Sequence, residues 1–238
     1  MKKSKRIKVA FDPRILYAFI LLSFVVSIVF VSIKLALSPV TADKIGERTR
    51  ADYILMLLQC AFGVVAILCP SFINKKIKLI IPSHMMIAYA VFLYCAIYLG
   101  EVRAFYYNVP HWDSYLHTFS AMMLGTLGYS FISLLNNSDK IPINLSPAFV
   151  FLFTFCFAVT MGAIWEIYEF LGDLIFNTNM QKYMLSDGTN LIGKAALTDT
   201  MKDIILDALG SLVIAIIGYI SQKKKKNYLE KFELKAEI

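Results

Sequence analysis

Apolar runs long enough to cross a bilayer recur along the whole chain. A hydrocarbon layer of about 30 Å takes about 20 apolar helical residues, because lipid offers no hydrogen bonds to an unsatisfied backbone. Six windows meet or approach that length: 15–33, 53–69, 79–99, 115–135, 148–170 and 204–220. Pro70 follows the second window, and we expect it to end that helix. The pattern predicts an all-α polytopic integral membrane protein, a bundle of about six transmembrane helices in a single membrane domain spanning 1–238.

Two polar stretches interrupt this pattern. One covers 100–114, and the other, 177–202, is predicted to be an external loop. The second contains a strong turn signal at 186–190 and, at Thr200 and Asp203, the spacing of a capping box. We therefore expect this loop to fold down as a lid or a re-entrant element before the last helix starts near residue 204. After that helix, 221–238 is predicted to be a cytoplasmic basic tail that ends in a surface helix.

Composition separates this chain from soluble proteins. Hydrophobic residues make up 58% of it and charged residues only 17%, which is too apolar for a soluble domain of 238 residues. The four cysteines fall inside the apolar windows and show no Cys-x-x-Cys spacing, so we interpret them as packing residues.

The positive charge predicts the orientation. Basic residues near the ends of spans stay on the cytoplasmic side. They collect before the first window, between the second and the third, and after the last: Lys2, Lys3, Lys5, Arg6, Lys8, Arg14, Lys75, Lys76, Lys78 and Lys223 to Lys226. Lys44, Arg48 and Arg50 in the first external loop argue weakly the other way. We predict that both termini are cytoplasmic, where the net charge of +7 would face anionic lipid headgroups. No nucleic-acid partner is needed to explain it, and protein partners cannot be read from the sequence.

Ionisable residues gather at one end of the last three windows. Those of each window share a helix face, because they repeat at three or four positions. They are Asp113 and His117 on the fourth window, Glu166, Glu169 and Asp173 on the fifth, and Asp199, Asp203 and Asp207 on the sixth. With 1.5 Å of rise per residue, all three stripes fall at about the same depth, near the outer interface. Gly125, Gly128 and Gly210 would let the fourth and sixth helices approach closely and bring their acidic ends together.

Such a concentration of acid needs compensation. A carboxylate in the bilayer costs about 2.5 to 3.5 kcal/mol on insertion scales, and the basic residues nearby, Lys194, Lys202 and Arg103, are too few to offset it. A divalent cation, shared protons or a water-filled vestibule would each provide that compensation. Alternatively, the acids are solvated helix ends, with Asp199 and Asp203 stabilised by the dipole at a helix N-terminus.

Oxygen ligands with one histidine suit a divalent metal ion, although Mg²⁺, Mn²⁺, Zn²⁺ and Ca²⁺ are not distinguished. Our hypothesis for the metal ligands is the set His117, Asp113, Glu169, Asp173 and Asp207. A carboxylate in such a cluster can also act as a general base, and for that role we name Glu166 and Asp203.

These residues carry a resemblance to a known family. The order Asp113 and His117, then Trp165-Glu166-x-x-Glu169 with Asp173, then Asp199-Thr200-x-x-Asp203-x-x-x-Asp207 with Gly210, resembles the bacterial YjdF-like membrane proteins. The last acidic segment is faintly similar to the VanZ-like family, in which an asparagine often occupies the position of Asp207. The resemblance covers roughly 79–218. It implies a multi-pass protein of the bacterial plasma (inner) membrane and implies no activity, because the family is largely uncharacterised.

Three functions fit an outward-facing acidic and histidine site. The first is a metal- or acid/base-dependent hydrolase or transferase acting on a lipid or envelope substrate. The second is a cation- or proton-coupled transporter, for which polar groups should continue to the inner face, whereas the inner halves of these windows are nearly all apolar. The third is a non-catalytic envelope accessory protein. A site open only to the outside favours the first.

Overall fold

The computed structural model describes residues 13–39, 48–77, 79–136, 144–185, 188–224, 226 and 228–236. Most of these residues belong to six helices that are long and apolar enough to cross a membrane. Their bounds are α1 Pro13–Leu37, α2 Arg50–Ile77, α3 Ser83–Leu93 continued by the π-helix η1 Tyr94–Val102, α5 Trp112–Asn136, α6 Pro147–Phe176 and α7 Lys194–Lys223. Each apolar window of the sequence overlaps one of these helices. The predicted all-α bundle of about six helices is therefore confirmed.

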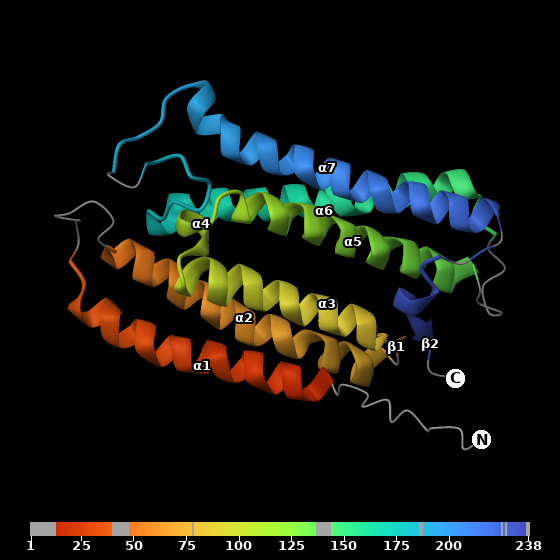
Figure 1. Ribbon diagram of the computed structural model, residues 1–238, viewed down its shortest axis with the longest axis horizontal. Helices are drawn as coiled ribbons and strands as arrows, with labels where there is room; N and C mark the ends of the chain where they lie inside the picture. The colour runs from red at the N-terminus through yellow and green to blue at the C-terminus, as the bar shows by residue number, and fades with distance from the viewer. Residues whose placement is uncertain are drawn as a thin grey trace, which may run out of the picture.

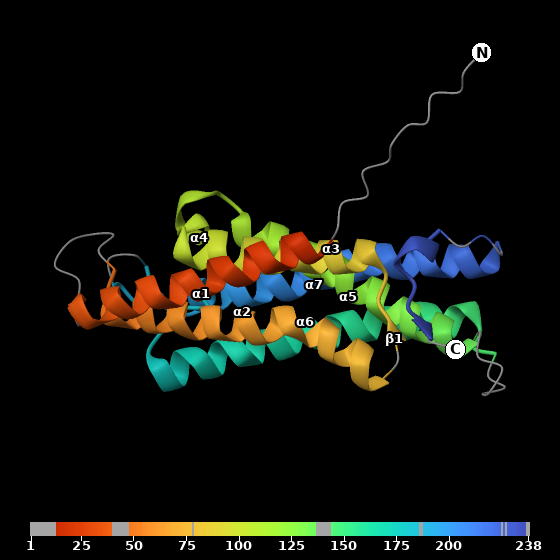
Figure 2. The ribbon, with the colours of Figure 1, turned by 90° about the horizontal axis from the view of Figure 1, so that it is seen from below.

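The helices form two groups that lie side by side (Figures 1 and 2). In the first group, α1, α2, α3 and η1 share an apolar core that includes Ile20, Phe24, Cys60 and Ile97. In the second, which we call the α5–α6–α7 bundle, each helix packs extensively against the other two. All three stripes of ionisable residues belong to this second group, so its packing decides how they meet.

Close approach of α5 and α7 is confirmed at Gly210. A methyl group there would lie 2.8 Å from the backbone oxygen of Thr118 and 3.1 Å from the Cβ of Ala121. Such contacts leave room for a glycine only, and so α7 lies directly against the backbone of α5. One turn before Gly210, Asp207 is consequently carried into the interface between the two helices.

The second helix does not end where the sequence analysis placed its end. Pro70 lies inside α2, which continues to Ile77. A proline removes one backbone hydrogen bond and bends a helix, but transmembrane helices tolerate it where the neighbouring structure satisfies the freed group. Pro70 is buried, and Figure 2 shows α2 changing direction toward its C-terminal end. The proline thus marks a bend and not a stop.

The last helix begins about ten residues earlier than predicted. Gly193, with a φ of 62°, precedes the first turn of α7 at Lys194, and no side chain caps that turn. Ala195, Ala196 and Leu197 are good helix formers, which explains the early start. Thr200 and Asp203 lie inside the helix, so the predicted capping box was wrong and the predicted loop 177–202 is shortened by its last nine residues.

The described part of the tail forms a 3₁₀ turn and a short strand where a surface helix was expected. The described tail residues form the 3₁₀ turn η2 Glu230–Phe232 and the strand β2 Lys235–Ala236, which pairs antiparallel with β1 Leu79–Ile80. Hydroxyls on α5 hold the tail: Ser130 accepts a hydrogen bond from the backbone N–H of Leu234, and Ser133 donates one of 2.7 Å to Glu233. These contacts with α5, together with the pairing of β2 with β1, hold the segment extended.

Candidate functional site

The ends of α5, α6 and α7 that carry the acidic stripes lie at the end of the molecule opposite to β1 and β2 (Figure 1). We call this the acidic end of the bundle. The short helix α4 Phe105–Asn108 and the described loop residues 177–185 and 188–193 lie at the same end. His117, Glu166, Asp203 and Asp207 are each less than a tenth exposed there. The stripes predicted separately from three apolar windows therefore converge in one buried place.

His117 lies at the centre of this convergence. Its Nδ1 is 3.4 Å from both carboxylate oxygens of Asp207 on α7. Its Nε2 is 3.8 Å from an oxygen of Asp113, one turn away on α5, and 3.8 Å from an oxygen of Glu166 on α6. A separation of 3.4 Å is at the limit for a hydrogen bond and 3.8 Å is beyond it. The imidazole is thus oriented by Asp207 through Nδ1, while its Nε2 faces two carboxylates that it does not bind directly.

A glycine on α6 makes room for Asp207. A methyl group on Gly162 would overlap the carboxylate of Asp207, because the two helices pack with this side chain between them. No larger residue could occupy that position without moving the carboxylate away from His117. Gly162 is therefore part of the site, and sequence reasoning missed it because its role depends on a partner 45 positions later in the chain.

Three of the predicted residues have the spacing of metal ligands. One ligand atom each of Asp113, His117 and Asp203 lies within 4.8 Å of the others. Divalent cations bind at about 2.0 to 2.6 Å from each ligand atom, so two ligands on opposite sides are separated by about 4 to 5 Å. The observed group fits that geometry, with two ligands from α5 and one from α7.

Unsatisfied oxygens surround this group. Among the described residues, both oxygens of Glu166, Oδ1 of Asp203 and Oδ1 of Asp207 are buried without a hydrogen-bond partner. A buried carboxylate oxygen without a partner is costly and therefore rare in folded proteins. Lys202 offers partial compensation at 3.8 Å from Asp203 and 3.9 Å from Asp199, too far for hydrogen bonds. Among the described residues, the cluster is therefore short of positive charge and of hydrogen-bond donors.

The structure does not bring Glu169 and Asp173 into the three-residue group. Glu169 accepts a hydrogen bond of 2.9 Å from the indole of Trp165, one turn earlier on α6. Asp173 accepts three hydrogen bonds, from the hydroxyl of Thr178 and from the backbone N–H groups of Met180 and Gln181. Asp173 thus organises the start of the loop after α6. The metal roles of both residues stay predictions, and each side chain has another partner.

The loop after α6 brings a cation toward the acids, as a lid would. Lys182, with a φ of 50°, is half-buried, and its ammonium lies 5.2 Å and 5.5 Å from the ring centres of Tyr106 and Tyr107. The side chain of Gln181 donates a hydrogen bond to the hydroxyl of Thr200, which ties the loop to α7. Sequence reasoning counted Lys194, Lys202 and Arg103 as basic partners and missed Lys182, because nothing local predicts where the loop folds.

Charge explains why Lys182 stays protonated in this environment. Burial by itself would lower the pKa of Lys182. Nearby negative charge outweighs burial and raises that pKa above its usual value; it comes from Tyr107, when ionised, and from Glu101, Asp113 and Glu169. Burial, together with the charge of Asp113, raises the pKa of Tyr106 well above its usual value, so its phenol stays neutral. The ammonium therefore faces a neutral ring and a field of negative charge.

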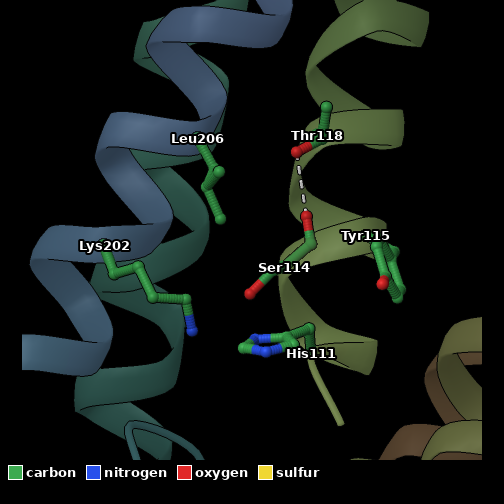
Figure 3. Close-up of a pocket in the computed structure, with 6 residues that line it drawn as sticks. All are labelled: His111, Ser114, Tyr115, Thr118, Lys202 and Leu206. Atoms are coloured by element: carbon green, nitrogen blue, oxygen red, sulfur yellow. Dashed lines mark hydrogen bonds between the residues drawn. The ribbon is translucent and has the colours of Figure 1, made fainter.

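A cavity of about 350 Å³ opens beside the acidic cluster, between α5 and α7 (Figure 3). Its lining residues are His111, Ser114, Tyr115, Thr118, Lys202 and Leu206. Figure 3 shows His111, Ser114 and Lys202 directed toward the space between the two helices. The Oγ of Ser114 is buried and makes no hydrogen bond in the described part of the chain. Sequence analysis did not single out Ser114, because a serine near a helix N-terminus is unremarkable without its surroundings.

The six apolar helices and the buried acidic and histidine group define a multi-pass membrane protein of the all-α class. The chain belongs to the family described as "Predicted membrane protein (DUF2238)", whose model matches residues 16–224. An uncharacterised protein of Thermotoga maritima is 30% identical over 138 residues, which are 58% of this chain and 62% of that protein. No solved structure gives a significant match. The resemblances to YjdF-like and VanZ-like proteins stay predictions, because neither family is among these matches.

Proposed function

We propose that this chain is a metal-dependent membrane enzyme, a hydrolase or transferase acting on a lipid or envelope substrate at the acidic end of the bundle. The observation that supports it is the group of Asp113, His117 and Asp203, with one ligand atom each within 4.8 Å. Both oxygens of Glu166 and Oδ1 of Asp207 are buried next to this group without a hydrogen-bond partner among the described residues, and they supply further negative charge. A divalent cation would neutralise that charge, which otherwise opposes insertion of the helices.

The geometry suggests a role for each residue. Asp207 holds Nδ1 of His117, which leaves Nε2 to act as the ligand, in the manner of the carboxylate–histidine–metal arrangements of many metalloproteins. Asp203 fits a ligand role better than the base role given to it from the sequence, because it belongs to the group of three. Glu166 is left as the general base: it is buried, its oxygens are unpaired, and one lies 3.8 Å from Nε2 of His117. When bound, a divalent cation would activate water or polarise the substrate.

The proposed topology places the acidic end outside the cell. α1 begins toward the same side of the molecule as the tail strand β2, away from the acidic end (Figure 1), as an even number of spans requires. Basic residues at that end, among them Arg14, Lys76, Lys223 and Lys224, favour its cytoplasmic placement against anionic headgroups of the bacterial inner membrane.

The test combines metal-dependent stabilisation with turnover. The purified chain would be heated with Mg²⁺, Mn²⁺, Zn²⁺ or Ca²⁺, and the stabilising ion would then be supplied in assays on phosphoester and acyl-ester lipids. Glu166→Gln should keep the metal-dependent rise in Tm and lose turnover, because it removes a base and no ligand. Asp203→Asn should lose both. If no ion raises the Tm of the native chain, or if turnover survives in both variants, the proposal is wrong.

A second candidate is proton- or cation-coupled transport, and one observation favours it. Beyond Asp207, buried hydroxyls continue along the α5–α6–α7 bundle, at Thr126, Ser130, Thr154 and Ser211. The interior of the inner half is therefore less apolar than the sequence suggested, and the Oγ1 of Thr154 has no hydrogen-bond partner among the described residues. Proton or cation flux in liposomes that is lost in Asp207→Asn would support transport, whereas flux equal to that of protein-free liposomes would reject it.

A further inference from the structure

We propose that the cavity between α5 and α7 binds the phosphate group of a membrane-resident amphiphile. This inference names the substrate class of the enzyme proposed above and in that sense rests on it. The residues that line the cavity are all outside the proposed metal group. His111, Ser114 and Lys202 provide the polar atoms, and Tyr115, Thr118 and Leu206 provide the largely apolar wall. A few polar groups in an apolar wall are what a lipid-binding pocket requires.

The three polar residues offer hydrogen-bond donors. The Oγ of Ser114 is buried and unpaired, so its hydroxyl can donate to a ligand. The ammonium of Lys202 is ion-paired with Asp203 at 3.8 Å and with Asp199 at 3.9 Å, and both distances are too long for hydrogen bonds, so its N–H groups can still donate to an anion. The imidazole of His111 is exposed at the mouth of the cavity. An ammonium, a hydroxyl and an imidazole around one space suit a phosphate oxygen, and none of the described residues that line this cavity is a carboxylate.

On both helices, a residue that lines the cavity is next in sequence to a residue of the proposed metal group. Ser114 follows Asp113 on α5, and Lys202 precedes Asp203 on α7. A phosphate bound by Ser114 and Lys202 would thus lie beside the ligands on both helices. This is where a phosphoester must be held if a cation at Asp113, His117 and Asp203 is to act on it.

The position on the side of the bundle favours an amphiphile over a soluble phosphate. Both helices that form the cavity are candidate membrane spans. Tyr115 is 63% exposed at its edge, and the neighbouring helix faces carry exposed apolar side chains, Phe119 on α5 and Ile205 and Leu209 on α7. Acyl or isoprenoid chains can pack along these faces while the head group enters the cavity. A soluble phosphate would gain nothing from them.

The experiment measures binding in metal-free detergent solution with EDTA, by native mass spectrometry. The probes are dioleoyl phosphatidic acid, dioleoylglycerol without phosphate, and inorganic phosphate. We expect phosphatidic acid to bind at least about tenfold more tightly than dioleoylglycerol, which lacks the group that accepts charge-assisted hydrogen bonds, and at least about tenfold more tightly than inorganic phosphate, which lacks the acyl chains. Lys202→Met should weaken phosphatidic acid binding about tenfold and Ser114→Ala several-fold. Lys224→Met, which removes an exposed charge next to the opposite end of α7, should not change it.

Three results would overturn the inference: equal binding of phosphatidic acid and dioleoylglycerol, equal binding of phosphatidic acid and inorganic phosphate, or equal effects of Lys202→Met and Lys224→Met. Ser114→Ala removes only a hydroxyl group, so we expect this variant to fold. It therefore provides the test if Lys202→Met does not yield folded protein. The binding experiment contains no metal, so its result does not depend on the metal test. If phosphatidic acid binds as expected but no ion stabilises the native chain, the proposed enzyme is rejected and the phosphate site is retained.

Discussion

His117 on α5 and Asp207 on α7 are 90 positions apart in the sequence, and the imidazole Nδ1 lies 3.4 Å from the carboxylate. This pair joins the two helices at the acidic end and decides which imidazole nitrogen is left to face Asp113 and Glu166. Its consequences can be tested by changing either residue or the glycines that let the helices approach.

Asp207→Asn should lower metal affinity about 10- to 100-fold, as the loss of an orienting carboxylate does in other metal sites. The amide can still accept one hydrogen bond from Nδ1 but does not supply negative charge. Titration of the purified variant with the stabilising ion, followed by Tm, would measure the change. An affinity equal to that of the native chain would show that Asp207 does not act through His117.

Gly162→Ala should destabilise the protein and impair metal binding, because the added methyl overlaps the Asp207 carboxylate. On helix propensity alone, the same substitution should stabilise by about 0.5 to 1 kcal/mol. The matched control is Gly172→Ala, also on α6, whose added methyl would meet only the flexible side chain of Met180 at 3.0 Å. Tm and bound metal measured for both variants separate the two effects. A stabilised, metal-binding Gly162→Ala variant would contradict the packing described here.

Asp173→Asn should loosen the loop after α6 and leave metal content unchanged. The carboxylate accepts three hydrogen bonds within the loop, and the asparagine retains a single acceptor oxygen. Each buried hydrogen bond lost costs about 1 to 3 kcal/mol. Hydrogen exchange of residues 177–185 should become faster in the variant. If metal is lost while exchange stays the same, Asp173 is a ligand, as the sequence analysis predicted.

Lys182→Met should also loosen this loop, because it removes an ammonium stacked over Tyr106 and Tyr107. Such contacts contribute about 0.5 to 2 kcal/mol. The pKa of Lys182 is raised, so its contribution is fully present below the unfolded value of about 10.4 and is lost as the pH rises through the folded value. Protease resistance of the native loop should therefore be constant between about pH 6 and 9 and fall above about pH 10. Equal resistance of Lys182→Met and native chain at neutral pH would refute this role.

The long helices and the convergence of the acids could be predicted because both follow from local spacing. A run of apolar residues as long as a bilayer is thick must form a helix there, and acids three or four positions apart must share a face. Gly210 even indicated which two helices would approach, and the structure places it against Thr118.

What the sequence did not predict depends on distant contacts. Pro70 bends α2 without ending it, which depends on what packs around it. Lys182 reaches the acidic end only because Asp173 fixes the start of its loop. Ser114 and Gly162 acquire meaning only from α7, which faces them from another part of the chain. No periodicity within either helix could have shown these partners.

The most direct test of the central claim is the metal content of the detergent-purified chain, measured by elemental mass spectrometry. The native chain should carry one divalent ion per molecule, and the Asp113→Asn, Asp203→Asn double variant should carry none. Glu169→Gln is the matched control, because its carboxylate lies outside the three-residue group and binds Trp165. That variant should retain the ion. A native chain without metal, or a double variant that keeps it, would contradict the proposed site.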